Sequence, residues 1–266
     1  MWQESGRQDV WDAELYAAHS THHRAQDEAF LATVRLRPDD RVLDLGCGSG
    51  EFTNRLAALV PDGLVLGVDA SASQLALAAS RRPANLQLTL GRLQDLDALT
   101  REMEFDAAIS RATLHWIPEA EHPALLCAVR RHLRPGGFLR AELGGRGQME
   151  TALALLDEVS VELGGPASPW FFPDPDAYAQ LLAEAGFSGA GFVRLLPQRR
   201  AMPTFQALQG FLRSQAFLGY LPALSEEARV AFRERAESLA ARELRRPDGS
   251  YDLEFVRLDL LAFRPL

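Results

Sequence analysis

Short apolar runs alternate with amphipathic segments through the first half of the chain, and this alternation limits the possible folds more than any other feature. Apolar runs typical of strands lie at residues 41–45, 64–69, 86–90, 105–110 and 138–142. Between them, apolar side chains recur at helical spacing in residues 51–60, 71–81 and 119–133. Strands that alternate with helices are typical of a parallel sheet covered by crossover helices. The pattern predicts an α/β fold with a doubly wound sheet that is buried on both faces.

The remaining segments predict elements on either side of this core. Helical patterns occur at residues 10–34, 149–163, 175–185, 204–217 and 225–244, and strand patterns at residues 190–196 and 254–263. We expect lid helices at residues 1–38 and an α/β core at residues 39–196. A helical cap should be inserted at residues 197–252, and residues 253–266 should form the final strand. The sheet should be mostly parallel, with this last strand antiparallel.

The composition is that of an ordinary folded protein. Of the 266 residues, 47% are hydrophobic and 24% are charged, which is close to the average for soluble domains. The 36 acidic residues outnumber 28 basic ones, all of them arginine, whereas chains that bind nucleic acid normally carry a positive charge. No apolar run approaches the ~20 residues of a membrane span, and the polar N-terminus lacks a secretory signal. We expect a cytoplasmic monomer or dimer, without nucleic-acid or membrane partners.

The cysteines and histidines do not predict a metal site. Cys47 and Cys127 are the two cysteines, and they form no CxxC pair. His19 and His23 have the i, i+4 spacing that can hold a metal on a helix, but no nearby carboxylate completes a ligand set. We therefore expect no metal.

A glycine-rich turn after the first strand carries the clearest chemical signal. The strand holds Asp44 near its end, glycines follow at positions 46, 48 and 50, and a helix begins directly afterwards. Glycine allows backbone angles that are closed to other residues and lets a ligand approach the main chain. The start of the helix offers unpaired N–H groups. Such a turn predicts a site for a nucleotide-like ligand.

Two classes of cofactor use turns of this kind. The NAD fingerprint requires a glycine or alanine at the sixth position of the turn, where this chain has Glu51. Asp44 would repel a pyrophosphate and attract a ligand that carries an ammonium and a sulfonium, by roughly 4 kcal/mol for contact in a surface-like dielectric. Asp69, at the end of the second strand, can accept hydrogen bonds from ribose hydroxyls in either class. The charge pattern favours a cationic ligand.

With these residues, the segment from Tyr16 to Leu143 resembles the class I S-adenosylmethionine-dependent methyltransferases. Within that family it is most similar to the small-molecule branch that includes trans-aconitate and malonyl-carrier-protein methyltransferases. The glycine turn, Asp69 and residues 105–110 and 133–137 carry the resemblance. It implies a Rossmann-like fold, S-adenosyl-L-methionine as the cofactor, and methylation of a small molecule.

The same resemblance implies the residues that contact the cofactor. The glycine turn would line the methionine part, Asp69 would hold the ribose, and residues 110–112 would close the methionine side. The expected cofactor contacts are Asp44, Gly46, Cys47, Gly48, Asp69, Ala70, Arg92, Leu93, Ser110, Arg111 and Trp116. The family usually has an acid for the adenine amino group where this chain has Arg92, so that contact would come from the backbone of Leu93 or from Asp95.

The nature of the acceptor decides whether a catalytic base is needed. A carboxylate is already ionised at pH 7, whereas a phenol or an amine would need a base, for which His115 is the candidate. Because the chain has no lysine, an acidic acceptor would have to be bound by arginine or by protonated histidine. Arg111 is the first choice, since it directly follows the fourth strand. The other expected substrate contacts are Tyr16, His19, Arg24, Trp170 and Arg194.

Three hypotheses stay open from the sequence. The first is a methyltransferase for a small molecule, for example one that forms an ester of a carboxylic acid. The second is a NAD-dependent oxidoreductase. The third is a protein that binds S-adenosylmethionine without catalysis, suggested by Arg92 and by the absence of a clear base.

Overall fold

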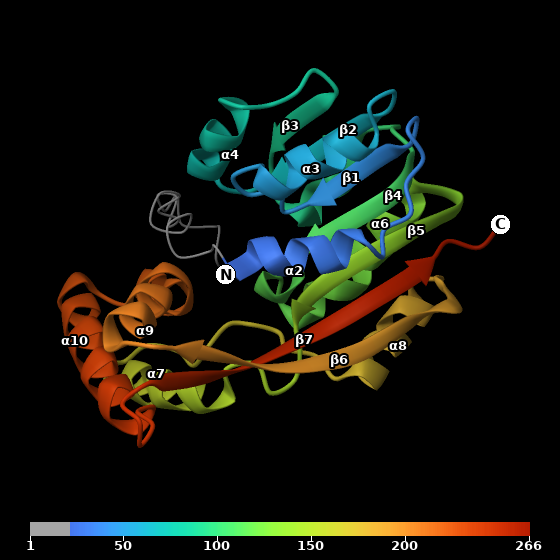
Figure 1. Cartoon of the computed structure of the whole chain (residues 1–266). Helices are drawn as coiled ribbons and strands as arrows, with labels where there is room; N and C mark the ends of the chain where they lie inside the picture. Colours follow the sequence, from blue (N-terminus) through green and yellow to red (C-terminus); the bar gives the residue numbers. More distant parts are fainter. Residues whose placement is uncertain (1–21) are drawn as a thin grey trace.

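A seven-stranded sheet in the order β3-β2-β1-β4-β5-β7-β6 forms the centre of the structure (Figure 1). The computed structural model describes residues 22–266, with side chains from Asp27 onward apart from Ala190. The strands are β1 Arg41–Leu45, β2 Leu64–Asp69, β3 Leu86–Leu90, β4 Phe105–Arg111, β5 Leu133–Gly144, β6 Ser188–Met202 and β7 Tyr251–Phe263. β1 to β5 pair in parallel, and β7 runs antiparallel to both β5 and β6. The predicted α/β fold class, with its antiparallel last strand, is confirmed.

The helices connect these strands, and some of them begin at side chains that cap them. They are α2 His22–Leu31, α3 Glu51–Leu59, α4 Ala72–Ala79, α5 Leu96–Thr100, α6 His122–His132, α7 Glu150–Glu162, α8 Pro175–Glu184, α9 Phe205–Phe211 and α10 Glu226–Glu243. Ser71, Thr204 and Ser225 each accept a hydrogen bond from a backbone N–H in the first turn of α4, α9 and α10. Such caps satisfy donors that have no partner within the helix. None of the described helices is long and apolar enough to cross a membrane.

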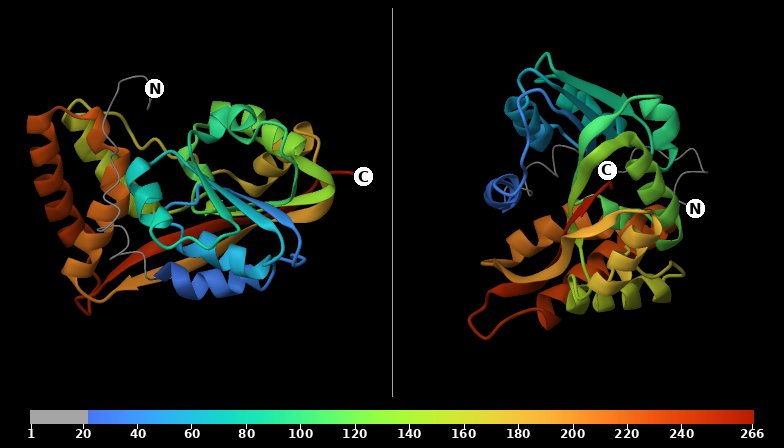
Figure 2. Two further views of the ribbon diagram at one scale, coloured as in Figure 1. Left: turned by 90° about the horizontal axis from the view of Figure 1, so that it is seen from above. Right: turned by 90° about the vertical axis from the view of Figure 1, so that its right-hand side faces the viewer.

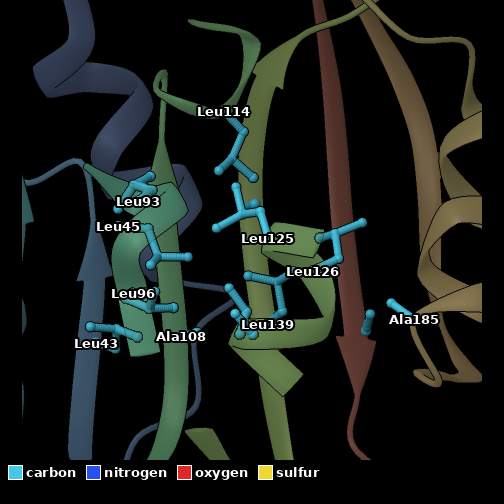
Figure 3. Packing of buried hydrophobic residues seen from close by; sticks show 14 of the residues in the cluster. Leu43, Leu45, Leu93, Leu96, Ala108, Leu114, Leu125, Leu126, Leu139 and Ala185 are labelled. Carbon is cyan, nitrogen blue, oxygen red and sulfur yellow. The ribbon is translucent and has the colours of Figure 1, made fainter. Parts of the chain in front are cut away.

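Two layers of helices bury the central strands. α2 and α3 cover one face with Phe30 and Leu56, which pack on Val42 and Ile109 (Figures 1 and 2). α5, α6 and α8 cover the opposite face, where Leu125 and Leu126 lie against the strand residues Leu45, Ala108 and Leu139 (Figure 3). Strands buried on both faces need apolar residues at successive positions, which explains the continuous apolar runs of the sequence.

Several element boundaries differ from the predicted ones. The Pro135 to Gly137 turn lies inside β5, which begins at Leu133 and has an irregular register opposite Phe105 and Ala107. The helical pattern of residues 204–217 divides into α9 and a π-helical turn, Leu212–Ala216. β6 and β7 are longer than predicted, because they stay paired from Ser188 and Phe263 out to Met202 and Tyr251.

The long β6 and β7 pair carries a second hydrophobic cluster, which we call the cap. It contains Leu156 of α7, Phe211 of α9, Phe232 of α10 and Phe255 of β7. Figure 1 shows α7, α9 and α10 together beyond the arrowheads of β1 and β4. The apolar packing therefore assigns α7 to the cap, although the sequence analysis counted residues 149–163 with the core. The outer ends of β6 and β7 also belong to the cap.

We expect Phe232→Ala to destabilise the protein by about 3 to 5 kcal/mol, because truncating a buried aromatic side chain leaves a cavity. Phe232 is fully buried, and its ring lies 5.2 Å from the rings of both Phe217 and Tyr220. Val230→Ala on the same helix is the matched control, since Val230 is 51% exposed. Chemical denaturation measures both variants. Equal stability of the two would contradict the packing described for the cap.

Candidate active site

The glycine turn lies at the carboxyl ends of β1 and β2. The N–H groups of Gly46 and Cys47 donate to the carbonyl oxygen of Val68, at 2.8 and 3.1 Å. Gly46 and Gly48 both have positive φ angles, and the space around the two residues differs. A Cβ on Gly46 would lie 2.2 Å from Thr113, whereas a Cβ on Gly48 would meet no atom within 4 Å. The backbone of Gly48 therefore borders open space that a ligand can approach.

Asp69 fixes this turn from the end of β2. Its two carboxylate oxygens accept hydrogen bonds from the N–H groups of Gly48 and Ser71, each at 2.8 Å. A carboxylate oxygen has more than one acceptor position, so these backbone bonds leave capacity for hydroxyl donors of a ligand. Asp69 thus orients an anionic acceptor beside the open space at Gly48.

Asp44 lies beneath the turn and is almost completely buried. Its Oδ2 accepts a hydrogen bond from the Thr53 hydroxyl at 2.6 Å. Burial raises the pKa of the Asp44 carboxyl to about 7, against the lowering effect of this hydrogen bond, and the charge of Asp69 raises it further. A buried carboxyl that titrates near neutral pH responds strongly to any cation brought close to it.

An aromatic cavity opens where the carboxyl edge of the sheet meets the cap. Its five aromatic wall residues are Trp116, Trp170, Phe172, Phe211 and Phe255. Its polar side chains are His115, Gln148, Gln215 and Arg257. Trp170 lies between two other aromatic residues of the wall. Its ring centre lies 5.3 Å from that of Trp116 and 6.2 Å from that of Phe172. Ala112 and Met149 also line the cavity, and both have the positive φ angles that strain side chains other than glycine.

His115 presents a neutral ring to this cavity. The backbone N–H of Gly144 donates to His115 Nδ1 at 3.3 Å. Because that nitrogen accepts, the proton of the neutral ring lies on Nε2, which is then a donor. Loss of solvent lowers the pKa of His115 to about 3, and the positive charge of Arg257 lowers it further. Such a ring donates a hydrogen bond but is a poor general base at pH 7.

Arg257 is the charged cavity residue that the sequence analysis missed. It lies on β7 opposite Gly144 of β5 and Leu196 of β6. Its side chain is 5% exposed, and its Nε lies 3.8 Å from Glu142 Oε1. A signal was present, because Arg257 and Asp259 are charged residues within the mostly apolar run of residues 255–263. Only the pairing of β7 with β5 shows that Arg257 reaches the cavity.

Comparisons with known proteins give the family. Residues 42–137 match the family model described as a methyltransferase domain. A trans-aconitate 2-methyltransferase of Deinococcus radiodurans is 35% identical over 188 residues, which are 66% of this chain and 69% of that protein. One of Rhodococcus jostii is 30% identical over 263 residues, 95% of this chain and 99% of that protein.

The chain belongs to the class I S-adenosylmethionine-dependent methyltransferases. It is an enzyme of the trans-aconitate methyltransferase type, and its cofactor is S-adenosylmethionine. Among solved structures, the YcgJ protein of Bacillus subtilis matches 92% of this chain and 100% of its own, with a TM-score of 0.62 and 15% identity. That likeness concerns the fold alone. The family confirms the methyltransferase hypothesis over the NAD-dependent oxidoreductase.

The methyltransferase's own residues fit this cofactor. The space over Gly48 admits a ligand against the main chain, and Asp69 offers acceptors for the ribose hydroxyls. Asp44 provides a carboxyl that a nearby ammonium or sulfonium would ionise. When bound, the cofactor supplies a methyl group on a positively charged sulfur.

Other expected cofactor contacts have structural partners. The Ser110 hydroxyl is buried and donates to the Leu45 carbonyl oxygen at 2.9 Å, so it ties β4 to β1. Cys47 is buried, and burial raises the pKa of its thiol, which disfavours a thiolate. The cofactor contacts of Ser110 and Cys47 stay predictions. Ala70 is exposed and lies between Asp69 and the start of α4.

The region expected to meet the adenine is built around one acidic residue. An Arg92 Nη lies 3.8 Å from Glu121, and the Gln94 side chain donates to the same carboxylate at 2.5 Å. Leu93 is buried in a 3₁₀ turn, Leu93–Asp95, while Asp95 is exposed. The adenine contact through Arg92 or Leu93 stays a prediction.

Arg111 differs from its expected role. Its guanidinium lies 2.8 Å from Asp27 of α2 and 3.3 Å from Glu142 of β5, and its side chain is 7% exposed. Its cationic group also lies 4.9 Å from the centre of the Phe30 ring. Arg111 therefore holds α2 on the sheet, and its position does not support the expected contact with a substrate carboxylate. The reason is that adjacent residues of a strand point to opposite faces.

The expected substrate contacts are distributed over several places. Trp170 lines the aromatic cavity, together with Trp116, which was expected as a cofactor contact. Arg194 is 56% exposed and pairs with Asp259 at 2.9 Å, away from that wall. Arg24 is described only as a residue of α2, and Tyr16 and His19 lie outside the described residues. Among the described residues, no group of three or more His, Cys, Asp or Glu side chains could hold a metal.

We expect Asp69→Ala to weaken the binding of S-adenosylmethionine more than tenfold. Two hydrogen bonds from ribose hydroxyls to a charged acceptor would be lost, each worth about 1.5 to 3 kcal/mol. Asp62→Ala is the control, because Asp62 is an exposed acid in the loop before β2. Calorimetric titration measures the affinity, and thermal melting verifies that both variants fold. Unchanged affinity would remove Asp69 from the site.

We expect the affinity for S-adenosylmethionine to rise about tenfold between pH 6 and pH 8, through Asp44. The carboxyl has a pKa of about 7 without ligand. A bound cation would lower that pKa, so binding releases a proton and strengthens as the pH rises. Asp44→Asn should abolish this dependence. Comparing the variant with the wild type at each pH cancels titration of the ligand itself. A parallel pH profile for the two proteins would contradict the role of Asp44.

Proposed function

We propose that this methyltransferase transfers the methyl group to a carboxylate oxygen of a small acid bound in the aromatic cavity. The observation that carries the proposal is the pairing of Arg257 with a neutral His115 in one cavity wall. The names of the two relatives, both trans-aconitate 2-methyltransferases, support an acidic acceptor.

The state of His115 favours a carboxylate over a phenol or an amine. A phenol or an amine has to lose a proton during methyl transfer, and a ring with a pKa of about 3 accepts protons poorly at neutral pH. A carboxylate needs no base. Its oxygen can instead accept the Nε2 proton of His115. The expected catalytic role of His115 as a base is thereby replaced by a role in binding.

Arg257 supplies the charge that a carboxylate needs. Moving a carboxylate from water into a partly dry cavity is unfavourable unless a cation offsets the loss of hydration. The guanidinium forms paired hydrogen bonds with carboxylates. Arg257 is held in place by β7, close to Glu142 and above the ring of Phe255. It takes the part that the sequence analysis gave to Arg111.

The remaining work is positioning and exclusion of water. Effective molarities for well-oriented groups correspond to about 7 to 11 kcal/mol of the barrier. We propose that Asp69 and the Gly48 backbone hold the cofactor, while Trp116, Trp170 and Phe172 enclose the acceptor. Of the lid predicted at residues 1–38, residues 1–21 lie outside the described part of the chain, and α2 packs on the sheet. The cytoplasmic location and the monomeric or dimeric state stay predictions.

We expect Arg257→Met to lower kcat/KM for carboxylic acids at least about 30-fold, because removing one partner of a buried charge pair costs about 2 to 5 kcal/mol. The affinity for S-adenosylmethionine should change less than twofold, and Arg257→Lys should recover part of the activity. Arg242→Met on the exposed side of α10 is the matched control.

A panel of carboxylic acids, phenols and amines, with release of S-adenosylhomocysteine as the signal, measures these variants. Methylation of phenols or amines alone by the wild-type enzyme would contradict the proposed function. Undiminished ester formation by Arg257→Met would remove Arg257 from the acceptor site.

A further inference from the structure

The aromatic cavity has a mostly apolar wall with one arginine, whereas an acceptor with several negative charges would require several cations. We infer that the acceptor is a monocarboxylic acid with a flat, apolar body, rather than a tricarboxylic acid such as the trans-aconitate of the relatives' names. This inference rests on the proposed function and adds the class of acid to it. Three observations carry it: the chemistry of the walls, the number of cations, and the charge balance behind Arg257.

The walls favour a flat apolar body. Five aromatic rings line the cavity, together with the apolar side chains of Ala112, Met149 and Ala216. Trp170 and Phe172 are nearly parallel and stacked, with 14° between their planes and 6.2 Å between their ring centres. Aromatic surfaces of this kind bind planar apolar groups through contact area and through offset or edge contacts. Carboxylates placed against them would lose water and gain no partner.

Cations are scarce in the same walls. Arg257 is the one positively charged side chain among the described residues that line the cavity. His115 stays neutral and offers a single donor, while Gln148 uses its side-chain oxygen to accept from the Val256 N–H at 2.7 Å. The Gln215 side-chain nitrogen is buried and has no hydrogen-bond partner among the described residues. This N–H group can donate to one further acceptor, such as the second oxygen of the same carboxylate.

The charge of Arg257 is already shared with a carboxylate of the protein. Glu142 lies between Arg257 and Arg111, Arg111 also pairs with Asp27, and Arg140 pairs with Asp259 in a separate group. Each of these six side chains is exposed by 12% or less. Arg257 can therefore offset the charge of one acceptor carboxylate. A second and a third would meet the field of Glu142 with no further cation among the described residues of the cavity wall, which raises the free energy of binding.

A matched pair of substituted acrylic acids tests the inference. trans-Cinnamate has one carboxylate and a phenyl ring on its double bond, whereas trans-aconitate has two carboxylates on its double bond and a third on an adjacent methylene group. Calorimetry with the complete enzyme, saturated with S-adenosylhomocysteine, measures the binding of each acid. We expect trans-cinnamate to bind at least tenfold more tightly than trans-aconitate, and cinnamamide, its neutral isostere, to bind more weakly than trans-cinnamate. Trp170→Ala should weaken trans-cinnamate and leave trans-aconitate unchanged.

Binding of trans-aconitate that equals or exceeds that of trans-cinnamate would overturn the inference, and so would failure of both acids to bind. Turnover with S-adenosylmethionine separates this result from the proposed function. Formation of the methyl ester of trans-aconitate alone would overturn the monocarboxylate inference while supporting carboxylate methylation. Methylation of a phenol or an amine, with no ester from any acid, would defeat both.

Discussion

The antiparallel pairing of β6 with β7 is the interaction on which the two-part architecture depends. The pair continues from the sheet into the cap, with Val193 opposite Leu260 in the core and Ala201 opposite Asp252 beyond it. Backbone hydrogen bonds therefore fix the cap relative to the sheet, and the α7, α9 and α10 helices pack on a frame that is already oriented. Arg257 lies where this frame leaves the sheet, opposite Gly144. Its position is set by strand register rather than by a flexible loop, as a binding site requires.

The sequence predicted the core of this fold well, because periodicity is a local property. The bounds of β1, β2 and β3 were predicted to the residue, and those of α3, α4 and α6 within three residues, whereas the short helix α5 was not predicted. Residue 111 shows where local reasoning ends. Its place at the end of β4 could be predicted from the sequence. The face to which its side chain points, and its ion pair with Asp27 of α2, depend on packing between distant segments. The assignment of α7 to the cap likewise depends on contacts with Phe232, which lies far along the chain.

His115 gives a similar lesson about chemistry. The sequence identifies a histidine after a strand end, which suggests a base. Its behaviour is decided by the backbone N–H of Gly144, 29 residues further along, and by the loss of solvent beside Phe172. Neither is visible in the local sequence, because both arise from the pairing of β5 with its neighbours and from the loop after α7. A residue type suggests a role, and its surroundings select among the roles open to it.

The two halves of the site carry opposite charge preferences, and this has a consequence for release of the product. Asp44 and Asp69 favour a cation on the cofactor side, while Arg257 favours an anion on the acceptor side. Under the proposed function, esterification removes the negative charge that Arg257 binds, and transfer of the methyl group leaves the cofactor's sulfur neutral. Both products therefore lose a charge interaction that their precursors had. The same residues that bind the reactants thus weaken the binding of the products, so turnover needs no separate device for release.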